Sequence, residues 1–357
     1  MSFFLIISAL LWGIGHLAGA PLRARLAMIS LLYGAILLVH LLLSADNALR
    51  LSIGGSFGGW LVLGGAVVLS WVYARFLGRL KARSAPVETA PGATFSEAEL
   101  ERYARHIVLR EIGGSGQKRL KAARVLVVGA GGLGSPALLY LAAAGVGTIG
   151  VVDDDIVDNS NLQRQVIHRD ADIGKAKVFS AEAAMRAQNP HVTVRPYNRC
   201  LNEAVAAALI ADYDLVLDGT DNFDTRYLIN RVCAAAAKPL VAAALTQLEG
   251  QISIYDPASG APCYQCIFPK APAPGLAPAC AEAGVLGPLP GVVGAMMAVE
   301  AVKLISQAGT PLRGTMLIYD ALYGESRRIG LKSRSDCPIC GNIARERALL
   351  RAGKPSD

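Results

Sequence analysis

The run Gly129–Gly134 contains the first residues whose types and spacing could do chemistry. It reads Gly-Ala-Gly-Gly-Leu-Gly, follows the β-branched run Val125–Val128 and opens a stretch of helical composition. Glycines let the backbone approach a phosphate, and a helix N-terminus offers free N–H groups and partial positive charge. Asp153 lies about 20 residues further on, where a carboxylate can bind ribose hydroxyls. The pattern predicts a nucleotide-phosphate turn and by itself suits NAD, FAD and ATP equally. The candidate glycines are Gly129, Gly131, Gly132 and Gly134.

Polar residues beyond this turn favour ATP over NAD. The run Ser160–Gln165 is followed by Lys175 and Lys177, and the run Asp218–Asn222 ends another predicted strand. A triphosphate needs cations for its β- and γ-phosphates, whereas hydride transfer needs none beyond the pyrophosphate site. A carboxylate at the C-terminal edge of a strand is well placed to hold Mg²⁺ beside phosphates. Taken singly, Lys175 reads as a surface charge and Asp218 could cap a turn, but together these residues favour ATP.

Two C-x-x-C pairs, Cys263–Cys266 and Cys337–Cys340, account for four of the seven cysteines. Four thiolates form a closed, tetrahedral zinc site, which is structural rather than catalytic. The pairs are far apart in the chain, so such a site would join two distant segments of one domain. The alternative is two unrelated pairs, one of them redox-active.

Three further cysteines remain. Cys233 lies in an alanine-rich helical stretch and is expected in the core, and Cys200 has no assigned role. Cys280 lies in the segment 269–290, which is dense in Pro, Gly and Ala and reads as a mobile loop. A thiol on such a loop is exposed enough to attack an activated acyl group, although an inert role is equally compatible with the sequence.

Alternating strands and helices must position these residues. Predicted strands cover residues 125–128, 148–152, 193–197, 214–217 and 239–242, and helical stretches between several of them cover 137–144, 175–188 and 223–237. This alternation predicts an α/β domain with a mostly parallel sheet and helices on both faces. Gln251–Tyr255 and Met316–Tyr319 are expected to add an antiparallel portion. The run Ser96–Glu99 has capping-box spacing and predicts the start of a helix.

The first 80 residues hold the excess hydrophobicity of the chain. Hydrophobic residues make up 53% and charged residues 18% of the 357 residues, against about 25% charged in ordinary soluble domains. A disordered chain is therefore excluded. The apolar runs Phe3–Ala20, Leu26–Leu43 and Gly58–Leu77 each approach the roughly 20 residues that cross a bilayer. We expect an anchor of about three transmembrane helices in residues 1–83, the first being the least secure. The alternative is a buried helical domain, although soluble helices normally carry a charged face.

Basic residues set the expected orientation of this anchor. Arg23 and Arg25 lie between the first two runs, and Arg75, Arg79 and Lys81 end or follow the third. The positive-inside rule places the N-terminus outside and the rest of the chain in the cytoplasm, at the inner (cytoplasmic) membrane. Residues 84–94 read as a linker, residues 95–345 as a separate cytoplasmic domain, and residues 346–357 as a tail. The net charge of +7 suits a membrane surface and an acidic partner, and we expect no nucleic-acid partner.

From about Phe95 to Gly341 the chain resembles the MoeB/ThiF/HesA adenylyltransferases, relatives of the ubiquitin-activating enzymes. The resemblance implies a Rossmann-like fold and an enzyme that uses ATP and Mg²⁺ to adenylate the C-terminal glycine of a ubiquitin-like sulfur-carrier protein. The matching segments are Arg102–His106, Gly129–Gly134, Ser160–Gln165, Asp218–Asn222, Glu249–Gln251, both C-x-x-C pairs, Ala283–Gly287 and Glu300–Leu304.

The resemblance also assigns roles to individual residues. The nucleotide-site residues that it implies are Gly132 in the phosphate turn, Asp153 at the ribose, Asn161, Arg164, Lys177, Asp221 as the magnesium-associated acid, and Asn222. Arg105 matches an arginine that reaches the neighbouring subunit's site, which implies a homodimer. Cys280 matches a loop cysteine that forms a thioester or persulfide in some members and is dispensable in others.

The chain departs from the family's usual pattern in two places. It stops soon after Cys340 without a rhodanese domain, so a separate sulfur donor is expected, and it carries the apolar N-terminal runs. The expected pathway is molybdopterin or thiamine biosynthesis, with a carrier that resembles MoaD or ThiS and ends in Gly-Gly. The alternatives are a related activator of a tRNA or peptide substrate, an NAD-dependent oxidoreductase, and an inactive membrane scaffold.

Overall fold

The computed structural model describes residues 2–83, 94–273 and 283–342, and they fall into two compact units, one within residues 1–87 and one within 88–357. The N-terminal unit contains the helices α1 (Ser2–Leu17), α2 (Leu22–Leu42), α3 (Ala48–Ile53) and α4 (Phe57–Arg83). Each of the three predicted apolar runs lies largely within one of the longer helices. The loop between α2 and α4 contains the short helix α3, which Asn47 caps by accepting a hydrogen bond from Leu49 N–H.

A small aromatic cluster holds the N-terminal unit together. Trp60 is fully buried and packs edge-on against Phe4, while the Tyr33 hydroxyl donates to the Trp60 carbonyl. Most other apolar side chains of this unit are exposed, including Leu31 and Leu69. Such a surface is unfavourable in water, because each exposed apolar side chain forgoes the free energy of burial. The unit therefore presents an apolar exterior around a minimal core.

In the part of the chain that the structure describes, three helices are long and apolar enough to cross a membrane. They span Leu22–Leu42, Phe57–Phe76 and Pro288–Ser306. The first two have almost no buried residues, whereas half of the third is buried inside the second unit, so its apolar character serves that unit's core. Helix α1 is apolar but has only 16 residues, so it falls short of this length.

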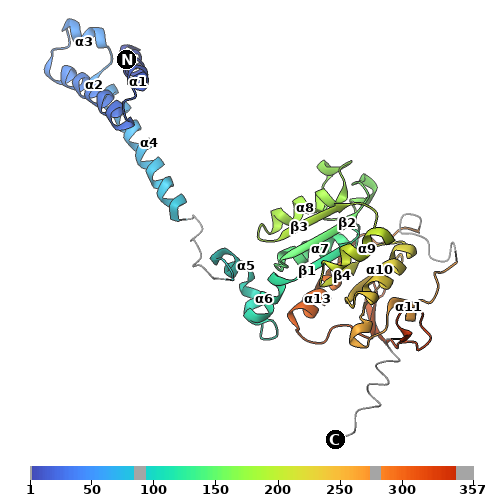
Figure 1. The fold of residues 1–357 in the computed structure, drawn as a ribbon. Coiled ribbons are helices and arrows are strands. Elements are labelled where there is room, and N and C mark those ends of the chain that lie inside the picture. Colours follow the sequence, from blue (N-terminus) through green and yellow to red (C-terminus); the bar gives the residue numbers. More distant parts are fainter. Residues whose placement is uncertain (1, 84–93, 274–282, 343–357) are drawn as a thin grey trace. The chain divides into compact units, whose positions relative to one another are not determined.

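The second unit is built on an eight-stranded sheet with the order β3-β2-β1-β4-β5-β6-β7-β8 (Figure 1). Strands β1 to β5 pair in parallel and β5 to β8 pair antiparallel. The sheet confirms the predicted mixed α/β architecture, including the antiparallel portion. The strands are β1 (Arg124–Val128), β2 (Thr148–Asp153), β3 (Thr193–Asn198), β4 (Leu215–Asp218), β5 (Leu240–Leu245), β6 (Glu249–Tyr255), β7 (Thr315–Asp320) and β8 (Glu325–Gly330).

Helices cover both faces of this sheet. One face packs its β1 side chains Val125 and Val127 against α6, α7, α8 and α13, and the other packs Leu126 and Val128 against α9, α10 and α11. The alternation of side chains along β1 makes both faces apolar, as a strand covered on both sides requires. The helices are α5 (Glu97–Ile107), α6 (Gly113–Ala122), α7 (Gly134–Ala143), α8 (Lys177–Gln188), α9 (Glu203–Ala211), α10 (Phe223–Ala235), α11 (Tyr264–Ile267) and α13 (Pro288–Ser306).

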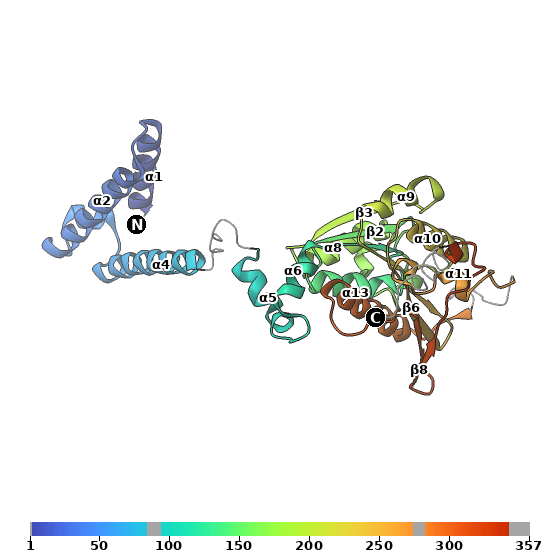
Figure 2. The same ribbon diagram turned by 60° about the horizontal axis from the view of Figure 1, so that its bottom comes forward.

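Local signals account for where several of these helices begin. Ser96 and Glu99 form the predicted capping box at the start of α5, and Asn222 caps α10 by accepting a hydrogen bond from Thr225 N–H. Such caps satisfy N–H groups that have no partner inside the helix. In Figure 2, α10 and α11 lie side by side, and the two helices are in contact. Cys233 on α10 is buried, as predicted.

Candidate active site and metal centre

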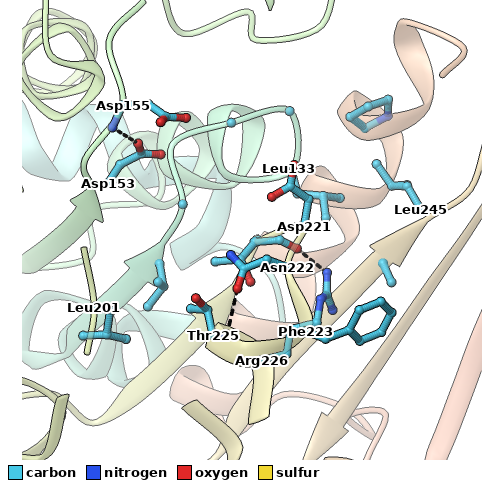
Figure 3. Close-up of a pocket in the computed structure, with 18 of the residues that line it drawn as sticks. Leu133, Asp153, Asp155, Leu201, Asp221, Asn222, Phe223, Thr225, Arg226 and Leu245 are labelled. Carbon is cyan, nitrogen blue, oxygen red and sulfur yellow. Dashed lines mark hydrogen bonds between the residues drawn. The ribbon is translucent and has the colours of Figure 1, made fainter. Parts of the chain in front are cut away.

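A cavity of about 640 Å³ lies at the carboxyl ends of the parallel strands. Its walls come from the loops that follow β1, β2, β3 and β4 and from the end of β5, which is where ligands bind in open α/β sheets. Figure 3 shows Asp153 at the end of β2, Asp155 on the loop that follows it, and Asp221 and Asn222 just before α10. Of the predicted site residues, the cavity is lined by Gly129, Gly131, Gly132, Asp153, Arg164, Lys177, Asp221 and Asn222.

The glycine-rich turn joins β1 to α7 at the cavity wall. Gly129 has a φ of 94°, a left-handed conformation that favours glycine. A Cβ on Gly134 would lie 1.9 Å from the Gly129 carbonyl oxygen, so Gly134 allows the helix to start close beneath the turn. Asp153 accepts a hydrogen bond from Ala130 N–H at 2.7 Å. The Asp153 carboxylate therefore holds the turn as well as lining the cavity.

The basic residues are held by defined partners. The Arg164 guanidinium donates to the Asn161 side-chain oxygen at 2.6 Å and to the Ser160 carbonyl at 3.2 Å. Asn161 does not line the cavity itself, so in this structure it orients Arg164. The Lys177 side chain is buried and pairs with Asp155 at 2.7 Å. A charged group buried beside one exposed carboxylate is well placed to receive an anionic ligand.

Two carboxylates follow β4 and have different environments. Asp218 is buried and accepts hydrogen bonds from the Thr220 backbone N–H and hydroxyl, so it caps this turn. Asp221 is exposed and faces the cavity, where its oxygens are free to bind a cation. Sequence reasoning missed Arg226, which is buried beside Asp218 at 3.9 Å and donates to the Ala243 carbonyl at 2.8 Å. Its position on the first turn of α10, where side chains face the strand ends, was the available signal.

Besides Asn161, two predicted residues stand apart from this cavity. Arg105 is exposed on α5 and Gly134 lies behind the turn, and neither lines the cavity. Cys280 falls outside the described residues. Several cavity residues were not predicted: Asp154, Asp155, Arg199, Cys200, Thr220, Arg226, Tyr264, Phe268 and Lys270.

The two C-x-x-C pairs meet in one buried cluster. The Sγ atom of Cys263 lies 3.8 Å from that of Cys266 and 3.5 Å from that of Cys337, and the Sγ atoms of Cys266 and Cys340 are 3.3 Å apart. Tetrahedral zinc with bonds of about 2.3 Å separates its sulfurs by roughly 3.8 Å, so four thiolates in this arrangement fit such an ion. Hydrogen bonds from the Cys263 thiol and from Arg334 N–H lower the pKa of Cys266. The cluster can therefore hold a metal ion between α11 and the C-terminal segment.

The fold is shared with solved structures of low sequence identity. The crystal structure of E. coli MccB with ATP has a TM-score of 0.59 at 22% identity, covering 70% of this chain and 77% of that one. The structure of PaaA has a TM-score of 0.59 at 24% identity, covering 73% and 82%. These matches show the fold class, an α/β domain.

The chain belongs to the ThiF family, whose model matches residues 103–339. A SAMP-activating enzyme E1 from Haloferax volcanii is 49% identical over 68% of this chain and 89% of its own length. A sulfur carrier protein adenylyltransferase from Thermus thermophilus is 46% identical over 72% and 96%. A probable adenylyltransferase/sulfurtransferase MoeZ from Mycobacterium tuberculosis is 46% identical over 76% and 72%.

Proposed function

We propose that the protein adenylates the C-terminal glycine of a ubiquitin-like sulfur-carrier protein at the expense of ATP. The observation that carries this assignment is the convergence of the glycine-rich turn, Arg164, Lys177 and Asp221 on one cavity. The names of the relatives, a SAMP-activating enzyme and a sulfur carrier protein adenylyltransferase, support the same activity. The expected carrier ends in Gly-Gly and resembles MoaD or ThiS, which places the reaction in molybdopterin or thiamine biosynthesis.

The geometry accounts for this reaction without a general base. A carboxylate oxygen of the carrier attacks the α-phosphorus, the bond from that phosphorus to the bridging oxygen of pyrophosphate breaks, and pyrophosphate leaves with the electron pair. Such a displacement needs alignment and charge neutralisation. Arg164 and Lys177 neutralise phosphate charge, and the glycine turn supplies backbone N–H groups. Mg²⁺ would be held at Asp221, where it would neutralise phosphate charge further.

The four-cysteine cluster is proposed to hold Zn²⁺ in a structural role. All four cysteines are buried and each offers one sulfur ligand, which is the ligand set of closed zinc sites. The ion would join α11 to the segment that follows β8. The ion would have a structural and not a catalytic role, because four protein ligands leave no coordination position for a substrate.

A homodimer and a separate sulfur donor complete the proposal. Arg105 is exposed on α5 and outside the cavity of its own chain, so it is free to enter the cavity of a second copy. In that arrangement each site would use Arg164 and Lys177 from one chain and Arg105 from the other. Sulfur would come from another protein after the carrier has been activated.

Replacing Cys280 by alanine is expected to leave adenylation intact. The displacement at phosphorus uses no thiol, so carrier-dependent exchange of labelled pyrophosphate into ATP should stay within about twofold of the unmodified protein. A thioester or persulfide function of Cys280 would appear only in the later transfer of sulfur to the carrier. A loss of exchange in C280A, in a protein that still binds ATP, would place the thiol in the first step instead.

Residues 1–83 are proposed to anchor the catalytic unit to the inner (cytoplasmic) membrane. Helices α2 and α4 are long, apolar and exposed, and Arg75 stacks on Trp71 at 5.2 Å near the end of the apolar part of α4, a pairing suited to a membrane interface. Helix α1, with 16 residues, would make the third crossing, so a reporter fused to the N-terminus should be active on the outer face and one fused after residue 345 should be active in the cytoplasm. A cytoplasmic signal from the N-terminal reporter would contradict this topology.

Pyrophosphate exchange tests the proposed activity. Purified protein is mixed with labelled pyrophosphate, ATP, Mg²⁺ and each Gly-Gly-ending carrier encoded in the same genome. Exchange should appear with at least one carrier and should vanish when its last two glycines are removed. Exchange with none of them would refute the assignment, whereas equal exchange with and without the glycines would indicate a substrate of another kind.

A further inference from the structure

His168 is a buried histidine that contacts the glycine-rich turn from beneath the cavity. It is 7% exposed and does not line the cavity. Its Nε2 lies 3.0 Å from the Ala130 carbonyl oxygen, and its Nδ1 lies 3.0 Å from the Ser180 hydroxyl on α8. The imidazole therefore bridges the second residue of the phosphate turn and the helix that begins with Lys177.

The partners of the ring determine where its proton lies. The Ala130 carbonyl can only accept a hydrogen bond, so Nε2 must carry the hydrogen. Burial lowers the pKa of His168 and keeps the ring neutral near pH 7, so Nδ1 is an acceptor for the Ser180 hydroxyl. Ser180 also lies 2.9 Å from Asp172 and has one proton for the two acceptors. Because this proton can go to Asp172, the Ala130 carbonyl rather than Ser180 selects the tautomer that donates to the turn.

The hydrogen bond to Ala130 fixes the direction of the next backbone N–H. The described peptide bonds are all trans, and in a planar trans peptide the carbonyl of one residue and the N–H of the next point in opposite directions. With its oxygen held by His168, the Ala130–Gly131 peptide directs the Gly131 N–H away from the histidine. Gly131 lines the cavity, and within the described residues its N–H has no hydrogen-bond partner.

One hydrogen bond holds this peptide, and another holds the peptide before it. His168 holds the carbonyl of the Ala130–Gly131 peptide, and Asp153 holds the Ala130 N–H of the preceding Gly129–Ala130 peptide at 2.7 Å. Glycine at position 131 offers little resistance to a rotated peptide, because it accepts both signs of φ. Without the histidine, the peptide could rotate and present its carbonyl oxygen to the phosphates, which would repel them.

We propose that His168 is a positioning residue that keeps the Gly131 N–H directed at a phosphate of the bound nucleotide. The inference rests on the proposed ATP site and deepens it, because His168 itself touches no ligand. Its contribution should be specific to phosphate, since the base and ribose would meet other parts of the cavity. Affinity for ATP should therefore depend on His168, and affinity for adenosine should not.

The test compares nucleotide binding by H168F and H168Q with binding by the unmodified full-length protein. Phenylalanine keeps a ring of similar size but cannot donate, whereas the glutamine amide can donate near the original Nε2 position. Dissociation constants for ATP·Mg²⁺ and for adenosine are measured by calorimetry. We expect H168F to weaken ATP binding about 10- to 100-fold, as the loss of a hydrogen bond to a charged group does. H168F should leave the dissociation constant for adenosine within about twofold of that of the unmodified protein. H168Q should recover most of the ATP affinity.

Asn189→Leu provides a matched control. Asn189 is fully buried and donates to the Ala142 carbonyl at 2.7 Å, so its loss also removes a buried donor to a backbone carbonyl, but away from the turn. It should lower the melting temperature without changing the ratio of ATP to adenosine affinity. Equal weakening of ATP and adenosine by H168F, or no weakening of either, would overturn the inference. Failure of the unmodified protein to bind ATP would instead refute the proposed function.

Discussion

Replacing Arg164 by alanine is expected to abolish carrier-dependent pyrophosphate exchange. The guanidinium is held in place at the cavity wall by Asn161 and Ser160, so in the proposed reaction it would neutralise phosphate charge without reorganising. Loss of one preorganised group of this kind costs about 100- to 1,000-fold in rate. The loss should lie at the upper end of this range for an arginine that is proposed to bind the ground-state triphosphate as well. Exchange of labelled pyrophosphate into ATP, measured at saturating carrier, checks this prediction.

Arg186→Ala is the control for this substitution. Arg186 forms an exposed ion pair with Glu182 on α8, and such pairs contribute little to stability, so exchange should be unchanged. Mixing R164A with R105A adds a test of the proposed dimer. If Arg105 serves the neighbouring site, mixed dimers contain one site that carries both substitutions and one that carries neither, and activity should partly return. Retention of exchange by R164A would contradict the assigned role of Arg164.

Replacing Cys266 by serine is expected to remove the bound metal and strongly destabilise the second unit. Structural zinc supplies several kcal/mol of folding free energy, and each kcal/mol shifts the melting temperature of a domain this size by roughly 2–4 °C. A decrease of at least about 10 °C should follow. Nucleotide affinity should fall as well, because Tyr264 lies between two of the cysteines and lines the cavity. Metal content by mass spectrometry and melting by circular dichroism measure the two effects.

Cys233→Ala separates metal loss from ordinary core damage. Cys233 is a buried cysteine on α10 outside the cluster, so its replacement should lower the melting temperature modestly while the metal remains. Prolonged treatment of the unmodified protein with a strong chelator should reproduce the effect of C266S. A C266S protein that kept a full complement of zinc would show that the four thiols do not form the site.

Much of the second unit could be predicted because its signals are local. The β-branched run that precedes Gly129 and the capping box at Ser96 depend only on neighbouring residues, and both appear as expected. The observed ends of several strands differ from the predicted ones by one to a few residues. Strand β5, for example, continues to Leu245. Its last residues are predominantly alanine, which has low strand propensity, and antiparallel pairing with β6 holds them extended.

The site was predicted less completely, because it depends on contacts across the sequence. Arg226 and Tyr264 reach the cavity through packing between α10 and α11, where Asn230 accepts a hydrogen bond from Tyr264 N–H at 2.8 Å. No spacing in the sequence reveals the contact between Asn230 and Tyr264. Similarly, the composition of α13 alone cannot separate a core helix from a membrane helix, and only its burial against α7 makes the distinction.

Transfer of label from ATP to the carrier tests the central claim most directly. The protein is incubated with a Gly-Gly-ending carrier and with ATP labelled in either the α- or the γ-phosphate, and the carrier is recovered under acidic conditions. Adenylation of the C-terminal glycine predicts that the carrier acquires the α-label and none of the γ-label, and that hydroxylamine releases the α-label as AMP. Label from the γ-phosphate, or no label on any such carrier, would contradict the proposed activity.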